Sequence, residues 1–315
     1  MTFTQLEYIV AVDNTRHFAR AAAQCFVTQP TLSMQIQKLE EELEIKIFDR
    51  SRQPVLTTDA GKEIVAQARK ILAERHAIED IIQLQKGVLQ GQLTIGIIPT
   101  LAPYLLPLFI HTFSKKYPNI KLVVSELTTK DIIAALREGR IDAGLLVTPL
   151  QEPGIMEQPL FYEELVAYVA KNNKAYKKQY VLATDIDAGK LWLLEEGHCF
   201  RSQIVNLCEL RKQTKEGAQF EYEAGSIETL RRLVDVNDGV TIIPELATLD
   251  MTVRQQSHLR NFKAPAPVRE VSLVTNRNYV KRRLLQALQQ SILDALPPKI
   301  KKNKSKGLVP LSLSR

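Results

Sequence analysis

Two cysteines nine positions apart are the residues of this sequence whose type and spacing most clearly suggest chemistry. Cys199 and Cys208 lie in the segment LLEEGHCFRSQIVNLC. In an α-helix, nine residues at 1.5 Å and 100° each place two side chains on opposite faces, with Cα atoms about 13 Å apart. A disulfide needs Cα atoms within roughly 7 Å. If the segment is helical, a bond between the two sulfurs requires it to unwind, so that oxidation becomes a conformational change.

The neighbours of Cys199 favour a reactive thiolate. His198 precedes it, Arg201 follows it, and a helix that begins here adds a favourable dipole, although two glutamates just upstream oppose ionisation. A thiolate reacts with peroxide to give a sulfenic acid, which a second thiol converts to a disulfide. Cys208 is the candidate nearby for that second thiol. From these residues alone, two buried cysteines acting as small hydrophobic side chains remain the alternative.

Other chemistry finds no support in the residue pattern. Cys25, in AAAQCF, is most simply a small core residue, and the remaining four histidines show no metal-ligand spacing. The chain has no CxxC or HExxH, and no GxxxxGK[ST], GxSxG or strand-linked GxGxxG. We therefore expect no metal, no cofactor and no enzyme activity.

The elements that position these residues fall into two architectures. Residues 4–90 have helical periodicity, with helices predicted around 6–10, 18–26 and 32–43, the last capped by Thr28 with Pro30 in its first turn. IKIFDRSRQPVLTT then predicts two short strands joined by a basic turn. This order is the outline of a winged helix-turn-helix.

Polar side chains on the third helix and the wing can then reach DNA, with base edges read by the helix and phosphates contacted by the wing. The acidic run at 40–44 is expected to face away from the DNA, and a three-helix bundle with no role in DNA binding remains the alternative. The outward residues are Thr31, Ser33, Gln35 and Lys38 on the helix, and Arg50 and Arg52 on the wing.

A long helix is predicted over 59–86. Ile64, Ile71 and Ile78 recur every seven residues along it, which favours pairing with a second copy. Arg75 interrupts a second row of the same period, and packing of the helix on its own domain is the alternative.

From residue 93 onward, β-rich runs alternate with amphipathic helical runs, which indicates a two-lobed α/β domain with mainly parallel sheets. Helical patterns are predicted at 130–138 and 226–236. The predicted strands are 93–98, 121–127, 143–147, 164–170, 191–194, 220–224, 240–243 and 271–274.

Net charge gives no argument for DNA binding. The 315 residues carry a formal charge of +7, but residues 299–315 hold six Lys and Arg and no acid, and residues 1–90 hold 11 Lys and Arg against 12 Asp and Glu. We expect 299–315 to be a disordered basic tail. We expect neither secretion nor membrane insertion, because the apolar stretch at 101–110 is short and contains two prolines.

The stretch FARAAAQCFVTQPTLSMQIQKLEEELEIKIFDR, at 18–50, resembles the amino-terminal signature of LysR-type transcriptional regulators. The resemblance implies a multidomain protein: an all-α winged helix-turn-helix at 1–58, a linker and dimerisation helix at 59–90, and a two-lobed, periplasmic-binding-protein-like α/β regulatory domain at 91–298. It implies a recognition surface made of Thr28, Gln29, Pro30, Thr31, Ser33, Gln35 and Lys38.

The segment EEGHCFRSQIVNLC is similar to the redox segment of the peroxide-sensing members of that family. That similarity implies that Cys199 is oxidised to a sulfenic acid and that Cys208 resolves it as a disulfide. The peroxide pocket that it implies contains Thr100, Thr129, His198 and Arg269. For Arg269, an exposed arginine at the start of a strand remains the alternative.

We therefore expect a hydrogen-peroxide sensor that activates antioxidant genes. Its expected partners are double-stranded promoter DNA, hydrogen peroxide, further copies of itself as a homodimer or homotetramer, the transcription machinery and a disulfide-reducing system, with no membrane partner. Its expected location is cytoplasmic, with the nucleoid. Two alternatives remain: a regulator of the same family whose cleft binds a small organic effector, and an α/β solute-binding protein with an oligomerisation helix.

Overall fold

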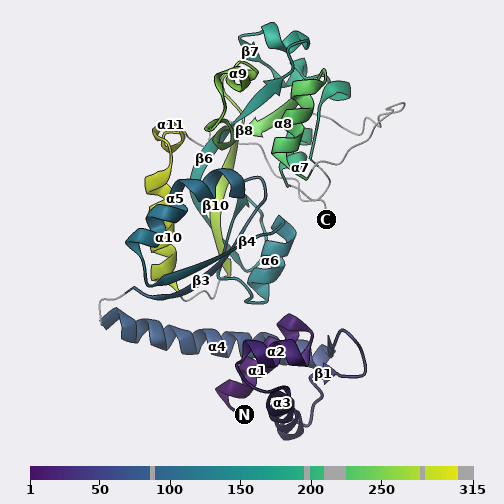
Figure 1. Cartoon of the computed structure of the whole chain (residues 1–315), viewed down its shortest axis with the longest axis vertical. Coiled ribbons are helices and arrows are strands. Elements are labelled where there is room, and N and C mark those ends of the chain that lie inside the picture. The colour runs from purple at the N-terminus through teal and green to yellow at the C-terminus, as the bar shows by residue number, and fades with distance from the viewer. Residues whose placement is uncertain (86–88, 195–198, 209–224, 277–280, 304–315) are drawn as a thin grey trace. The chain divides into compact units, whose positions relative to one another are not determined.

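The computed structural model describes residues 1–85, 89–194, 199–208, 225–276 and 281–303. The chain forms two compact units, the first built on residues 1–89 and the second on most of the remaining residues. Figure 1 labels the elements of both units.

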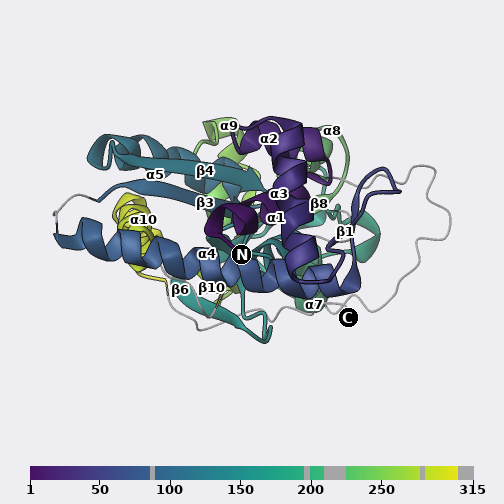
Figure 2. The same ribbon diagram turned by 90° about the horizontal axis from the view of Figure 1, so that it is seen from below.

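The first unit is three short helices, a two-stranded wing and the long helix α4, with α1 to α3 gathered at the amino-terminal end of α4 (Figure 2). As predicted, Thr28 caps the third helix: its hydroxyl accepts a hydrogen bond from the Thr31 N–H at 3.4 Å, and Pro30 occupies the first turn. The elements are α1 (Phe3–Thr15), α2 (Phe18–Gln24), α3 (Gln29–Glu42), β1 (Phe48–Asp49), β2 (Leu56–Thr57) and α4 (Asp59–Gln85).

Apolar side chains at helical spacing form the core of this unit. Ile9 of α1 and Ile36 of α3 are fully buried, and Val65 and Ala68 bring the first half of α4 into the same cluster. The wing is held against that core, because the Thr57 hydroxyl donates to Asp13 Oδ1 at 2.6 Å. Helix α3 and the wing therefore pack on one hydrophobic core.

The arginine that interrupts the periodic pattern of α4 is explained by its partner. Arg75 Nη1 lies 2.7 Å from Glu7 Oε1, and its guanidinium lies over the ring of Phe3. Six residues earlier, Arg69 Nη2 pairs with Asp13 Oδ2 at 2.8 Å. These contacts fasten α4 to α1 as far along the helix as Arg75.

The predicted seven-residue stripe is packed in its first part and exposed in its second. Ile64 and Ile71 pack partly against the core of their own unit, whereas Ile78 is 60% exposed. Packing on the chain's own domain therefore accounts for the first half of the stripe, and self-pairing stays a prediction for the second half.

The second unit has two lobes on one continuous sheet, with strand order β4-β3-β5-β10-β6-β9-β7 and β8 paired with β6. Strand β6 belongs to both lobes: residues 155–164 pair with β10, and residues 165–169 pair with β8. The strands are β3 (Gly91–Ile97), β4 (Ile120–Glu126), β5 (Ala143–Thr148), β6 (Ile155–Val169), β7 (Tyr180–Val181), β8 (Val240–Pro244), β9 (Leu259–Phe262) and β10 (Val268–Asn276).

The expectation of mainly parallel sheets is wrong. β3 pairs in parallel with β4 and β5, but β10 runs antiparallel to β5 and β6, and β6 runs antiparallel to β8 and β9. The antiparallel pairings come from β6, which passes from one lobe to the other, and from β10, which returns from the second lobe.

Helices cover the sheet in both lobes. In the first lobe, α5 and α10 lie on one side of β3 and α6 lies on the other (Figure 1). Gly96 and Gly144 let α6 approach closely, because a Cβ at either position would meet the Ile132 side chain within 3.0 Å. The helices are α5 (Ala102–Lys116), α6 (Thr129–Arg137), α7 (Cys199–Leu207), α8 (Ile227–Val236), α9 (Val253–Gln256), α10 (Arg282–Ala295) and α11 (Pro298–Lys301), with 3₁₀ turns η1 (Lys174–Lys177), η2 (Ala183–Asp185), η3 (Ala188–Lys190) and η4 (Glu245–Thr248).

Two of the predicted strands are not among those observed. The strand predicted at 191–194 is not formed, since Leu191 makes only an isolated bridge to Val240. The strand predicted at 220–224 lies outside the described residues.

The start of the predicted disordered tail is structured. Pro298–Lys301 forms α11, with Ile300 buried. Lys299 Nζ lies 2.5 Å from Glu245 Oε1 in η4, and the Asn303 side-chain amide donates to Glu245 Oε2 at 3.1 Å. An ion pair and one buried apolar side chain thus hold the chain as far as residue 303, and 304–315 lie outside the described residues.

Candidate functional site

The residues predicted to contact DNA lie on α3 and the wing. Most of the α3 set is exposed to solvent, while two members are half-buried because they face neighbouring elements. Exposed are Thr28, Gln29, Pro30, Thr31 and Lys38, and half-buried are Ser33 and Gln35.

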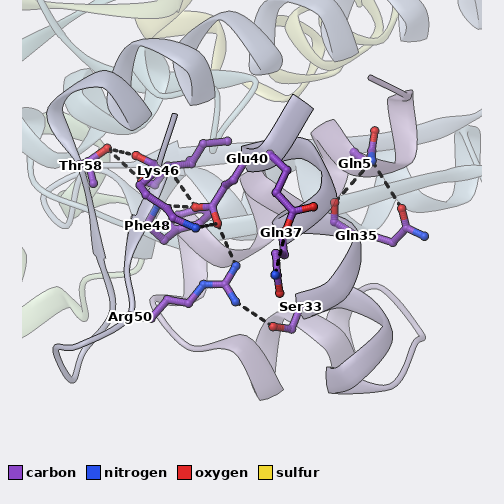
Figure 3. A network of polar contacts seen from close by, with 11 residues as sticks. Gln5, Ser33, Gln35, Gln37, Glu40, Lys46, Phe48, Arg50 and Thr58 are labelled. Carbon is purple, nitrogen blue, oxygen red and sulfur yellow. Dashed lines mark hydrogen bonds and ion pairs between the residues drawn. The ribbon is translucent and has the colours of Figure 1, made fainter. Parts of the chain in front are cut away.

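The wing arginines differ from each other. Arg52 is exposed, with Nε 3.6 Å from Asp49 Oδ2. Arg50 is exposed as well, but its guanidinium is paired within the unit: Nη2 lies 3.0 Å from Glu40 Oε2 and Nη1 donates to Ser33 Oγ at 3.0 Å (Figure 3). Glu40 was expected to face away in the acidic run, and that expectation is wrong, because its side chain is fully buried under the wing.

Phe26 is a surface residue that the sequence pattern does not single out. It is 96% exposed with φ of 57°, in the turn between α2 and α3, two residues before the cap of α3. The exposed ring of Phe26 therefore places an apolar side chain beside the polar surface of α3.

In the second unit, the segment between the two cysteines is helical. Cys199 is the first residue of α7, and the N–H of Cys208 donates to the Ile204 carbonyl at 3.0 Å, so the helical hydrogen bonding extends to the second cysteine. Because the segment is helical, the Cα atoms of Cys199 and Cys208 are about 13 Å apart, and a disulfide between them requires α7 to unwind, as the spacing predicted. The side chain of Cys199 and the whole of His198 lie outside what the structure describes.

The Cys208 thiol is free, half-buried and packed against the core of the second lobe. Burial raises the pKa of this thiol from its ordinary value of 9.0 to about 11. In the folded, reduced state Cys208 is thus a protonated, poorly nucleophilic thiol. Cys25 is likewise free and packs against the first unit's core, where burial raises its pKa.

This shift predicts how Cys208 reacts with an alkylating agent. At pH 8 its thiolate fraction is lower by about a hundredfold than that of an ordinary cysteine. Alkylation of Cys208 in the folded protein should therefore rise with pH toward about 11, while the urea-unfolded chain reacts with a midpoint near 9.0. Because the folded pKa is the higher one, burial of the neutral thiol stabilises the fold fully below pH 9 and loses this effect as the pH rises toward 11. Quantitative mass spectrometry of the Cys208 peptide measures both curves, and coincident midpoints would contradict the burial argument.

Arg269 forms the centre of the predicted pocket and is fully buried, so the exposed alternative is wrong. Its Nε donates to Glu163 Oε1 at 2.7 Å, Nη1 donates to Thr100 Oγ1 at 3.2 Å, and Nη2 donates to the Thr100 carbonyl at 3.2 Å. The guanidinium also lies 5.2 Å from the ring centroid of Phe200, the residue after Cys199. The structure thus brings together Arg269, Thr100 and the first turn of α7.

Glu163 is the residue that sequence reasoning missed here. It is fully buried beside the point where β6 passes from one lobe to the other, and its Oε2 accepts the Leu246 N–H at 3.1 Å. Burial raises the pKa of this carboxyl, and the Arg269 charge opposes the rise. A glutamate within the apolar run LFYEELVAYVA was the available signal.

Thr100 and Thr129 follow the carboxyl ends of two neighbouring parallel strands. β3 and β4 pair with Ile97 opposite Glu126, and each threonine lies three residues beyond that pair. Both threonines are buried. This edge of a parallel sheet is where α/β proteins commonly bind small ligands.

Within the described part of the chain, no group of three His, Cys, Asp or Glu residues is placed to hold a metal ion. No helix there is long and apolar enough to cross a bilayer.

Two family models match the chain and together span most of it. The model for "Bacterial regulatory helix-turn-helix protein, lysR family" matches residues 3–62, and that for "LysR substrate binding domain" matches residues 86–297. The chain belongs to the LysR family. The predicted fold class, a helix-turn-helix domain with a linker helix and a two-lobed α/β domain, is confirmed.

Relatives of this LysR-family protein share about a third of its residues. The "Hydrogen peroxide-inducible genes activator" of Dickeya chrysanthemi is 35% identical over 274 residues, 87% of this chain and 89% of that protein. The "DNA-binding transcriptional dual regulator OxyR" of Escherichia coli K12 is 34% identical over 292 residues, 93% of this chain and 95% of that protein.

Solved structures give the same result for the LysR-family fold. A full-length OxyR variant from Pseudomonas aeruginosa matches with a TM-score of 0.79 and 34% identity, covering 93% of this chain and 98% of that one. A hydrogen-peroxide-bound OxyR mutant from Corynebacterium glutamicum matches with a TM-score of 0.60 and 28% identity, covering 93% and 92%.

Proposed function

We propose that this protein is a hydrogen-peroxide-sensing, DNA-binding transcriptional regulator of antioxidant genes. The observation that carries the proposal is the position of Cys199 and Cys208 at the two ends of α7, in a chain whose relatives are named hydrogen peroxide-inducible genes activators. These two cysteines can react with peroxide and then form a disulfide only if α7 unwinds. In the described part of the second unit, no other pair of residues has this property.

The chemistry has two steps. The Cys199 thiolate attacks one peroxide oxygen, the O–O bond breaks, and hydroxide leaves and is protonated to water, which yields a sulfenic acid. The Cys208 sulfur then attacks the sulfenic sulfur, the S–O bond breaks, and a second water leaves as the disulfide forms. A cellular dithiol system must return the two electrons before the next response. Each oxidation is stoichiometric and reversible, which makes the protein a sensor and not an enzyme.

Arg269 and Thr100 support the first step. The contacts of Arg269 with Glu163 and Thr100 use four of its five N–H donors and leave one Nη1–H. We propose that this N–H and the Thr100 hydroxyl stabilise negative charge on the departing peroxide oxygen. Thr129 and His198 complete the proposed pocket.

DNA binding belongs to the first unit. The exposed face of α3 is proposed to enter the major groove, with the wing beside it. The exposed Ile78 on the second half of α4 supports pairing into a homodimer, and two dimers would make a homotetramer. We propose that such assemblies bind promoter DNA in the cytoplasm, within the nucleoid, and act on the transcription machinery.

The test of the sensor is intact-protein mass spectrometry with thiol alkylation, before and after near-equimolar hydrogen peroxide. We expect a loss of two daltons confined to the Cys199 and Cys208 peptide, with Cys25 still alkylated. If both Cys199 and Cys208 still alkylate after peroxide, the disulfide switch is wrong and the family alternative, a small organic effector in the cleft, should be tested by ligand soaks.

Recognition by α3 is tested with matched glutamines on the same helix. Gln35→Ala should lower affinity for a selected operator by about tenfold, since a lost base contact costs about 1–3 kcal/mol, and leave affinity for scrambled DNA unchanged. Ser33→Ala should act in the same sense. Gln37→Ala is the control, because Gln37 is exposed and donates to Glu41. Fluorescence anisotropy on both duplexes measures the effect; an equal loss on the two would show a phosphate or folding role.

A further inference from the structure

A buried carboxylate lies beneath the wing, in a position that the recognition surface does not use directly. Glu40, on the last turns of α3, is fully buried. Its Oε1 accepts the N–H groups of Ile47 and Phe48 at 2.8 and 3.1 Å, at the start of the wing. A buried carboxylate that accepts two backbone donors ties one end of the wing to α3.

The second oxygen of this carboxylate holds the wing arginine. Arg50 Nη2 lies 3.0 Å from Glu40 Oε2, and the other guanidinium nitrogen, Nη1, reaches Ser33 Oγ at 3.0 Å (Figure 3). The same guanidinium lies 4.9 Å from the ring centroid of Phe18. Arg50 is therefore fixed from three sides, by α2, by the middle of α3 and by Glu40.

We propose that Glu40 is a positioning residue for DNA recognition: it holds the Arg50 fork against Ser33, so that the wing and the base-reading face of α3 meet the DNA as one rigid surface. The inference rests on the proposed DNA-binding function and assigns a role that direct contact does not require.

Charge and geometry distinguish this role from a phosphate contact. A free arginine on a wing adds affinity for any duplex, because phosphates carry no sequence information. Glu40 Oε2 pairs with Arg50 at 3.0 Å and more distantly with the exposed Lys46 Nζ at 3.9 Å, so the charge of Arg50 is partly offset and its main contribution is the orientation of Ser33 and the wing. Loss of Glu40 should therefore reduce sequence discrimination rather than general affinity.

The experiment uses the full-length protein with Glu40→Gln and, as its matched control, Glu41→Gln. In Glu40→Gln the side-chain carbonyl can still accept the Ile47 and Phe48 N–H groups, but the amide presents N–H to Arg50 in place of a carboxylate oxygen. Glu41 is exposed on the same helix and accepts from Gln37, so its substitution changes the net charge equally. The probes are an operator selected from a random duplex pool by the wild-type protein and a scrambled duplex of the same composition.

We expect Glu40→Gln to reduce the ratio of operator to scrambled affinity by about tenfold and Glu41→Gln to leave it within about twofold. Both variants should bind scrambled DNA equally. Arg50→Met should reduce the ratio as Glu40→Gln does, and the double variant should be no worse than either single one, because both changes remove the same contact. An unfolded fraction lowers both affinities together and leaves the ratio unchanged, so a merely structural role does not give this result.

The outcomes separate this inference from the function beneath it. If the wild-type protein selects an operator and Glu40→Gln retains the ratio of Glu41→Gln, or if Glu40→Gln and Arg50→Met act additively, the positioning role is wrong while DNA recognition stands. If the wild-type protein enriches no sequence from the pool, the proposed DNA-binding function fails, and the positioning role fails with it.

Discussion

Cys199→Ser should abolish the response to hydrogen peroxide while leaving operator binding by the reduced protein unchanged. Serine keeps nearly the same volume and polarity but has no nucleophilic thiolate, so no sulfenic acid can form. The expected loss is complete rather than graded, since Cys208, with its raised pKa, offers no second reactive thiolate at neutral pH. The measurement is promoter-dependent transcription with and without peroxide, beside anisotropy on the reduced protein.

Cys208→Ser is the matched variant for this prediction. It should still react with peroxide but stop at the sulfenic acid, which a dimedone-type probe traps with a corresponding gain in mass. A Cys199→Ser protein that still switched transcription with peroxide would remove the proposed mechanism, and a Cys208→Ser protein that trapped no probe would place the first oxidation elsewhere.

Glu163→Gln should lower the free energy of unfolding of the second unit by about 3–5 kcal/mol, because it leaves the buried Arg269 guanidinium without a compensating charge. Both side chains are fully buried, so water cannot replace the lost partner. The chain has a single tryptophan, Trp192, which packs against the core of the second lobe. Urea unfolding followed by tryptophan fluorescence therefore reports this unit specifically.

The control is the adjacent carboxylate. Glu164 is partly exposed and lies 3.9 Å from Lys299, so Glu164→Gln should cost less than about 1 kcal/mol. Replacing both buried partners, as Glu163→Leu with Arg269→Met, should recover much of the stability lost by the single change. Equal unfolding midpoints for Glu163→Gln and Glu164→Gln would show that the Arg269 charge is compensated by another group.

Periodicity predicted the elements whose sequences are locally consistent. The caps and spacing of α3, the length of α4 and most strands of the second unit follow from residue pattern alone. The prediction of a strand at 191–194 was wrong. An apolar run does not show whether a neighbouring strand is available to pair with it, and here Leu191 makes only an isolated bridge to Val240. The sequence also did not predict the antiparallel pairings of the sheet. Strand direction depends on how the chain crosses between the lobes rather than on the residues within one strand.

The sequence singled out the candidate site in two ways: Cys199 and Cys208 by their spacing and neighbours, and Thr100, Thr129 and Arg269 by the family resemblance alone. Cys199 and Cys208 are recognisable from their separation along one helix. Glu40 and Glu163 are not, because each is a charged residue in a setting that usually means solvent: an acidic run in one case, a strand flank in the other. Their burial depends on distant partners, Arg50 and Arg269, which sequence alone does not bring together.

The passage of the chain between the two lobes limits how the second unit can move. β6 crosses at residues 164–165, the returning chain crosses beside it, and the Leu165 N–H donates to the Pro267 carbonyl at 2.8 Å between the two crossings. A hinge motion of one lobe relative to the other would break the hydrogen bond between Leu165 and Pro267 and separate the buried ion pair of Glu163 and Arg269. Unwinding α7 disturbs only a nine-residue helix. For the proposed disulfide switch, the least costly motion is thus a local refolding of α7 while the connection between the lobes stays intact. We therefore expect oxidation to create a new surface on one lobe rather than a new angle between the two lobes.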